Sequence, residues 1–147
     1  MRIKFSSKTA TAVHILLYIE DYRNEEKITS EVLVDTTGVN AVNIRKILSS
    51  LKKANLITVK PGIGGTFLLE KPENITLRTI FEAVEEKEDS LFRMHDQPNS
   101  NCPVGFSING VLENRLISLK ENMLKDMEGM TLLDMYKDMK KLLKEKK

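Results

Sequence analysis

Residues 40–70 constrain the fold of this chain most, because a strongly amphipathic helical pattern passes directly into two strand patterns. The apolar residues of 41–54 recur at i, i+3, i+4 and i+7, and so lie on one side of a predicted helix: Ile44, Ile47, Leu48 and Leu51. Asn40 is a suitable N-cap for this helix. The alternating, β-branched stretch 56–60, the Gly-rich turn 61–65 and the stretch 66–70 then predict a β-hairpin.

Two more helices are predicted before this segment. Residues 6–22 have apolar side chains at helical spacing after a cap at Ser6 or Ser7, and Thr29 caps a short helix that ends at Gly38. Two helices around a glycine corner, the second apolar on one side and basic on the other, are typical of a helix-turn-helix. Because a hairpin follows directly, we predict a winged helix-turn-helix. This is a mainly α fold with a small β-hairpin, and its wing tip is 61–65.

The second half of the chain has a different pattern. Residues 76–86 predict a fourth helix, whereas 87–106 lack a sustained period and contain Pro98 and Pro103, which predicts a loop. A long helix follows, and 132–143 form a last amphipathic stretch before a basic, solvated end. We therefore divide the chain into a winged helix-turn-helix domain (1–90), a loop that contains Cys102 (91–106), and a long helix with a helical tail (107–147).

The long helix carries an apolar seam that requires a partner. Its members recur at steps of three or four: Ile108, Leu112, Leu116, Leu119, Met123 and Met127. One partner would be the chain's own fourth helix. Helix-turn-helix proteins, however, commonly bind two half-sites as a twofold dimer. We therefore expect a homodimer whose interface is formed by five residues of the seam: Ile108, Leu112, Leu116, Leu119 and Met123.

Composition and charge narrow the functional classes. With 41% hydrophobic and 30% charged residues, the chain has the balance of a globular protein, and it has no apolar run long enough for a signal peptide or a membrane span. We therefore expect a cytoplasmic protein. The net charge is only +2, but residues 36–69 contain five basic residues and no acid. A local basic surface is typical of a phosphate-binding face, although a solvated helix face would show the same pattern.

The segment "NIRKILSSLKKANLITVKPGIGGTFLLEKPENITLRTIFEAVE" (43–85) resembles the Rrf2 family of bacterial transcription regulators. Its most specific part, "IGGTFLLEKPENITL", would not be expected in a generic winged helix. The resemblance implies a dimeric regulator, most simply a repressor, that binds a palindromic operator in double-stranded DNA. Its recognition helix would enter the major groove, and its wing would touch the backbone or minor groove. The chain departs from the family at Asn55, where many members have Gly, and at "NIR", where Tyr-Leu is commoner.

The chemistry of bases and phosphates predicts which residues make these contacts. Arg forms bidentate contacts with guanine and Asn with adenine, so Arg45 and Asn43 are the expected base-reading residues. Lys46 and Ser49 are further candidates for base or phosphate contact. Lys52 and Lys53 lie farther along the helix and are expected to meet phosphates. The resemblance adds contacts from the wing: Lys60, Gly62, Gly64 and Gly65.

Cys102 is the only cysteine of the chain. Cluster-binding members of the family hold an iron–sulfur cluster with three closely spaced cysteines in the corresponding loop, whereas a cluster needs about four ligands, mostly thiolates. Even with His95 nearby, Cys102 cannot supply them, so we expect no cluster, no zinc site and no other cofactor. If the long helix begins near Pro103, Cys102 lies at its N-terminus, where the dipole favours a thiolate. Two interpretations stay open: a redox-sensitive thiol, and an inert residue that packs at the start of the helix.

Other functional classes fit the sequence less well. The sequence has no Gly-rich phosphate loop after a strand, no His and Asp set at metal-ligand spacing, and no evident base for Cys102, so we expect no enzyme. Two alternatives are a winged helix used only for protein contact and a ligand-responsive regulator whose cysteine is inert. Salt-dependent binding to double-stranded DNA separates a DNA-binding regulator from an enzyme and from a protein-contact module.

Overall fold

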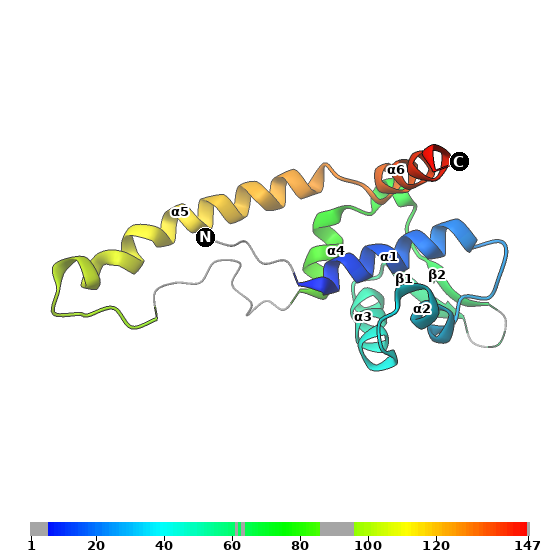
Figure 1. Ribbon diagram of the computed structural model, residues 1–147, viewed down its shortest axis with the longest axis horizontal. Helices are drawn as coiled ribbons and strands as arrows, with labels where there is room; N and C mark the ends of the chain where they lie inside the picture. The colour runs from blue at the N-terminus through cyan, green and yellow to red at the C-terminus, as the bar shows by residue number, and fades with distance from the viewer. Residues whose placement is uncertain (1–5, 61, 63, 86–95, 147) are drawn as a thin grey trace.

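The computed structural model describes residues 6–60, 62, 64–85 and 96–146. These residues form six α-helices, one short 3-10 helix and one two-stranded antiparallel sheet. In chain order the elements are α1 (Ser7–Tyr22), α2 (Ser30–Thr37), α3 (Ala41–Lys53), β1 (Ile57–Lys60), β2 (Gly65–Leu68), η1 (Pro72–Asn74), α4 (Leu77–Val84), α5 (Pro103–Glu128) and α6 (Leu132–Glu145). The predicted mainly α fold with a hairpin directly after the third helix is confirmed (Figure 1).

Local side-chain chemistry sets the corner between α2 and α3. The Thr29 hydroxyl caps α2 by accepting a hydrogen bond from the N–H of Val32, and the Asn40 side chain caps α3 by accepting one from the N–H of Asn43 at 2.9 Å. Between the two helices Gly38 has a φ of +71°, a left-handed conformation that glycine adopts without steric cost. Asn55, with φ +59°, has the left-handed conformation that the sequence allowed at the end of the third helix.

The wing is anchored to the segment that precedes α2. Within the hairpin, Ile57 pairs with Leu68 and Lys60 pairs with Gly65. Ile28 adds an isolated parallel bridge to Gly65, and the N–H of Thr66 donates to the carbonyl of Ile28 at 2.9 Å. The turn end of the hairpin is therefore held by the connection between α1 and α2 as well as by pairing of its own strands.

Helix α6 shares the principal core with α1. The main hydrophobic cluster combines buried side chains of α1 to α4 and β1 with Leu132 of α6, which is fully buried. Two backbone hydrogen bonds of 2.8 Å fix the start of α6, from the N–H of Leu77 to the carbonyl of Met130 and from the N–H of Leu132 to the carbonyl of Ile75. The predicted third part, 107–147, is therefore not separate in packing, since its last helix completes the core of the first part.

A polar cluster ties the outer turns of α6 to α1. Asp21 accepts a hydrogen bond from the Tyr136 hydroxyl at 2.9 Å and pairs with the Lys140 ammonium at 2.6 Å. The Lys140 hydrogen bond is the main cause that lowers the pKa of the Asp21 carboxyl, against the opposing effect of burial, and Tyr136 adds to the lowering. α6 is thus attached through both apolar and charged contacts.

Helix α5 projects from the domain (Figure 1). It begins at Pro103 rather than at residue 107, because proline is favoured at the first position of a helix. Its C-terminal part packs on α4 through a second, smaller cluster, in which Leu116 and Met127 are buried against Phe81. The predicted boundary between residues 90 and 91 lies outside the described residues.

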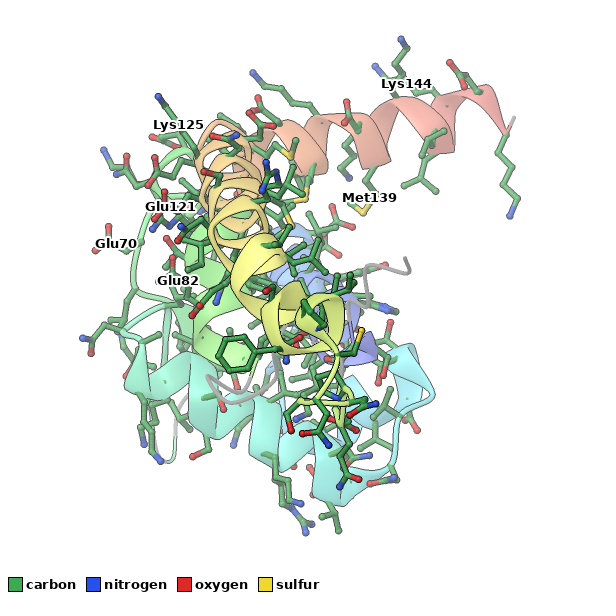
Figure 2. The ribbon with its side chains drawn as sticks, turned by 90° about the vertical axis from the view of Figure 1, so that its left-hand side faces the viewer. Glu70, Glu82, Glu121, Lys125, Met139 and Lys144 are labelled. Atoms are coloured by element: carbon green, nitrogen blue, oxygen red, sulfur yellow. The ribbon has the colours of Figure 1, made fainter. Side chains whose placement is uncertain are left out.

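The elements are arranged so that α2 and α3 lie at one side of the molecule and α6 at the opposite side, as both views show (Figures 1 and 2). Within the described part of the chain, no helix is long and apolar enough to cross a membrane.

Candidate nucleic-acid interface

Helix α3 presents a polar and basic face to solvent. Its apolar stripe is directed inward, with Ile44 and Leu51 fully buried and Ile47 nearly so. Every residue of α3 that the sequence predicted for DNA contact is exposed: Asn43, Arg45, Lys46, Ser49, Lys52 and Lys53. The caps at Thr29 and Asn40 and the turn at Gly38 set the direction of α3, whose polar face lies on the outside of the domain.

Val42 is an exposed residue of this face that the prediction missed. Its side chain is 58% exposed in the first turn of α3, beside Asn43. An apolar side chain at this position can contact the methyl group of thymine, which no polar neighbour can do as well. The signal was present in the sequence, because Val42 lies off the stripe formed by Ile44, Ile47 and Leu51 and so has no place in the core.

One side of α3 lies toward the start of α2, and the other lies toward α1. The pKa of the Glu31 carboxyl is lowered, chiefly by its own backbone N–H and the Thr29 hydroxyl and in part by the charge of Arg45. Arg45 is therefore within electrostatic reach of the start of α2. On the side that faces α1, by contrast, Asn43, Lys46 and Lys53 line a cavity.

The wing places its predicted residues unequally. Lys60 is exposed, and its Nζ lies 5.0 Å from the centre of the Phe67 ring, a cation–π contact that fixes the ammonium group on the wing. Gly62 is exposed at φ +87°. A Cβ on Gly64 would lie 2.4 Å from the tip of the Phe67 ring, so a side chain there would displace the ring on which Lys60 rests. Residues 61 and 63 of the predicted tip lie outside the described part.

The structure corrects the prediction for Gly65. It was predicted to approach DNA, but it is buried at the end of β2 that adjoins the turn, where it pairs with Lys60. It has φ +73°, and a Cβ there would lie 2.4 Å from the carbonyl oxygen of Ile28. Gly65 therefore allows two backbones to approach within the protein, and its part in the interface is to hold the wing in place.

The predicted seam of α5 is divided between two surroundings. Leu112, Leu116 and Met123 pack in the cluster around Phe81 of α4, within the same chain. Leu119 is 52% exposed and Ile108 is half-buried. Four more apolar side chains of α5 that the prediction did not include are exposed at 71, 78, 52 and 48%: Val104, Phe106, Val111 and Ile117.

Cys102 is exposed and forms the N-cap of α5. The backbone N–H groups of Gly105, first, and Val104 lower the pKa of its thiol, because they stabilise the thiolate more than burial disfavours it. Because α5 begins at Pro103, the condition under which Cys102 lies at the N-terminus of the long helix is met. His95 lies outside the described residues, and His14 is elsewhere, 3.2 Å from the Thr36 hydroxyl.

Comparison with known proteins assigns the chain to a family. The Rrf2 family pattern, described as that of an iron-dependent transcriptional regulator, matches residues 5–138. The chain belongs to the Rrf2 family. The resemblance seen in 43–85 is therefore confirmed and extends over nearly the whole chain, and transcription regulation is the activity of this family.

Individual relatives agree with this assignment. YwnA of Bacillus subtilis, which bears the name of an HTH-type transcriptional regulator, is 35% identical over 129 residues, which are 88% of this Rrf2 chain and 94% of YwnA. A crystal structure given as that of a DNA-binding protein is 31% identical, with a TM-score of 0.69, over 88% of this chain and 98% of the other. The structure of CymR, the global cysteine regulator of B. subtilis, shares the fold with a TM-score of 0.67 at 18% identity, over 92% of this chain and 98% of CymR.

The thiolates that an iron–sulfur cluster needs are too few in this sequence. In the described residues no three or more His, Cys, Asp or Glu side chains gather in a way that could hold a metal ion. The whole sequence offers one cysteine, Cys102, and its thiol is exposed at a helix end. An iron–sulfur cluster normally requires about four ligands, mostly thiolates. This member of the Rrf2 family therefore lacks the residues with which one subunit would hold a cluster.

Proposed function

We propose that this Rrf2 protein is a homodimeric, sequence-specific DNA-binding regulator that acts as a repressor on a palindromic operator, in the cytoplasm. The observation that carries the proposal is the solvent-exposed face of α3, which combines base-reading side chains with lysines and is followed directly by an anchored wing. Family membership supports the same function. No catalytic role is part of the proposal.

In this proposal α3 lies in the major groove. Arg45 and Asn43 read bases, since their side chains match guanine and adenine in bidentate geometry. They lie toward opposite sides of α3, with Lys46 and Ser49 between them on the exposed face. Lys52 and Lys53 meet phosphates. On the wing, Lys60 and Gly62 approach the backbone or the minor groove.

A twofold dimer is supported by the surface that α5 leaves uncovered. Val104, Ile108, Val111 and Leu119 follow one another at helical spacing beside the stripe that packs on α4. An exposed apolar stripe on a projecting helix favours association with a second helix. Leu119→Glu is expected to convert the dimer into a monomer in analytical ultracentrifugation. Ile117→Glu is the matched control, because Ile117 is 48% exposed on the other side of α5, away from this stripe, and it should leave the dimer intact. A dimer that survives Leu119→Glu would contradict this interface.

Cys102 supplies a route by which an oxidant could act on this dimer. The thiol is exposed, its pKa is lowered, and it stands at the end of the helix that carries the proposed interface. Oxidation to a sulfenic acid, or a disulfide with another thiol, would change the start of α5. The distance between the two copies of α3 in the proposed dimer would then change as well. Operator binding by the wild type and by Cys102→Ser, each reduced and then treated with hydrogen peroxide, tests the switch. An identical response of the two proteins would assign Cys102 an inert role.

DNA binding itself is tested by fluorescence anisotropy. We expect affinity for a labelled duplex to fall steeply between about 50 and about 200 mM salt, because released counterions drive the binding. On an operator selected from a randomised duplex pool, Arg45→Ala is expected to cost about 1–3 kcal/mol and to relax preference at one position. Equal loss on random DNA would instead give Arg45 a phosphate contact. Absence of any salt-dependent binding would favour a protein-contact module.

A further inference from the structure

The cavity between α1 and α3 has a composition that suits a sugar-phosphate unit of DNA. Its volume is about 500 Å³. It is lined by the first turns of α1, one side of α3 and single residues before α3 and at the end of α4: Ser7, Lys8, Thr11, Val39, Asn43, Lys46, Ile47, Ser49, Ser50, Lys53 and Val84. We propose that this cavity holds one backbone phosphate of the operator, and that Lys8 of α1 is a phosphate-binding residue. The inference rests on the proposed DNA-binding function and adds α1 to its contacts.

The polar lining is cationic. Lys8 comes from α1, while Lys46 and Lys53 come from α3, so lysines of two helices border one cavity. The Ser50 hydroxyl adds a neutral donor, and none of the lining residues that the structure describes is an acid. Ammonium groups, hydroxyls and amides are the side chains that bind phosphate oxygens in protein–DNA complexes.

The apolar part of the lining distinguishes a sugar-phosphate unit from a bare anion. Val39, Ile47 and Val84 form it, and Ile47 and Val84 are nearly buried. A free inorganic phosphate would gain nothing from such contacts, whereas the carbon atoms of a deoxyribose ring would cover this surface. Thr11 contributes a wall rather than a donor, because its hydroxyl donates to the carbonyl of Ser7 at 2.9 Å.

The first turn of α1 is fixed relative to α3 by Glu85. Its Oε1 accepts hydrogen bonds from the Ser6 hydroxyl at 2.6 Å and from the Thr9 hydroxyl at 2.7 Å, so the end of α4 holds the start of α1. Glu85 is an acid close to the cavity but not one of its lining residues. This contact sets the place of the first turn, and so of the Lys8 backbone, beside the cavity that Lys46 and Lys53 also line.

A helix in the major groove would place this cavity beside the sugar-phosphate backbone of DNA. An α-helix with its side chains is about 10–12 Å across, and the major groove is about 12 Å wide. A helix that fills the groove therefore turns one side toward each strand. The cavity opens on the side of α3 that faces α1, so it meets one strand while Val42, which does not line the cavity, faces the bases.

The test compares Lys8→Ala and Lys8→Gln with a lysine on the far side of the molecule. Lys144 lies on α6, opposite α3 (Figure 2), and Lys144→Ala is the matched control. Loss of one phosphate contact should reduce the slope of log K against log salt by about 0.9 per bound protomer. The affinity deficit of both Lys8 variants should therefore shrink by about 3.5-fold per protomer between about 50 and about 200 mM salt. Thermal unfolding of each variant verifies that it is folded.

A second measurement locates the phosphate. Neutral methylphosphonate is placed at one backbone position of the selected operator at a time. At one position per half-site the substitution should weaken the wild type but cause little further loss in Lys8→Gln, since the two changes remove the same interaction. If both Lys8 variants match Lys144→Ala in affinity and salt slope, the cavity does not bind phosphate, although DNA binding by the wild type still stands. If the wild type itself does not bind DNA, the proposed function fails first.

Discussion

Replacing Leu132 with alanine should unfold the DNA-binding half of this protein at a markedly lower temperature. Leu132 begins α6, and its side chain is 0% exposed in the main core. Removal of its methyl and methylene groups costs about 2 kcal/mol in transfer free energy, and the cavity left behind raises the loss to about 3–4 kcal/mol. For a chain of this size each kcal/mol lowers Tm by about 3 °C, so Tm should fall by about 10 °C.

The assay is circular dichroism during heating, at one protein concentration for all variants, because dimerisation would otherwise change the apparent stability. Leu142→Ala is the matched control, since Leu142 lies on the same helix but is 65% exposed, and it should change the unfolding free energy by less than about 0.5 kcal/mol. If Leu132→Ala melts within about 2 °C of the wild type, α6 does not contribute to the common core and the reasoning is refuted.

Three more predictions follow from single contacts. Gly65→Ala should destabilise the protein well beyond Gly62→Ala in urea titrations, because both have positive φ but only Gly65 would bring its Cβ to 2.4 Å from a backbone oxygen; equal losses would contradict this. The lowered pKa of Asp21 means that its ionised form stabilises the fold above its unfolded pKa and that this stability is lost as pH falls through the folded pKa, so wild type should lose stability in acid more steeply than Asp21→Asn. If the unfolding free energies of wild type and Asp21→Asn fall in parallel as pH is lowered, ionised Asp21 does not stabilise the fold. Since the pKa of Cys102 is lowered, iodoacetamide should alkylate the folded thiol with a midpoint at lower pH than the urea-unfolded thiol, and coincident midpoints would argue against stabilisation of the thiolate.

The reading helix could be predicted closely because its signals are local. The stripe from Ile44 to Leu51, the cap at Asn40 and the corner at Gly38 lie within a few residues of one another, and each has a short-range physical cause. The single cysteine also decided much from the sequence alone, because a cluster needs more thiolates than one chain has. The fold, the family and the exposed face of α3 follow from such features.

Spacing alone could not decide which surface covers each apolar residue. Leu116 and Leu119 belong to one predicted seam, yet Leu116 is buried on α4 while Leu119 is exposed, because only the path of the chain sets how a helix is rotated against its neighbour. Gly65 looks like a wing-tip glycine in the sequence, and only the distant carbonyl of Ile28 gives it a buried role.

The sequence by itself thus determined a winged helix-turn-helix with a basic reading helix and no means of holding a cluster in one subunit, since these depend on residue type and short-range periodicity. Only the tertiary structure placed Leu132 in the core beneath α1 and brought Lys8 to the same cavity as Lys46 and Lys53. Leu132 is far from α1 in the chain, as Lys8 is from Lys46 and Lys53. The packing of helices onto one core decides which of these side chains meet.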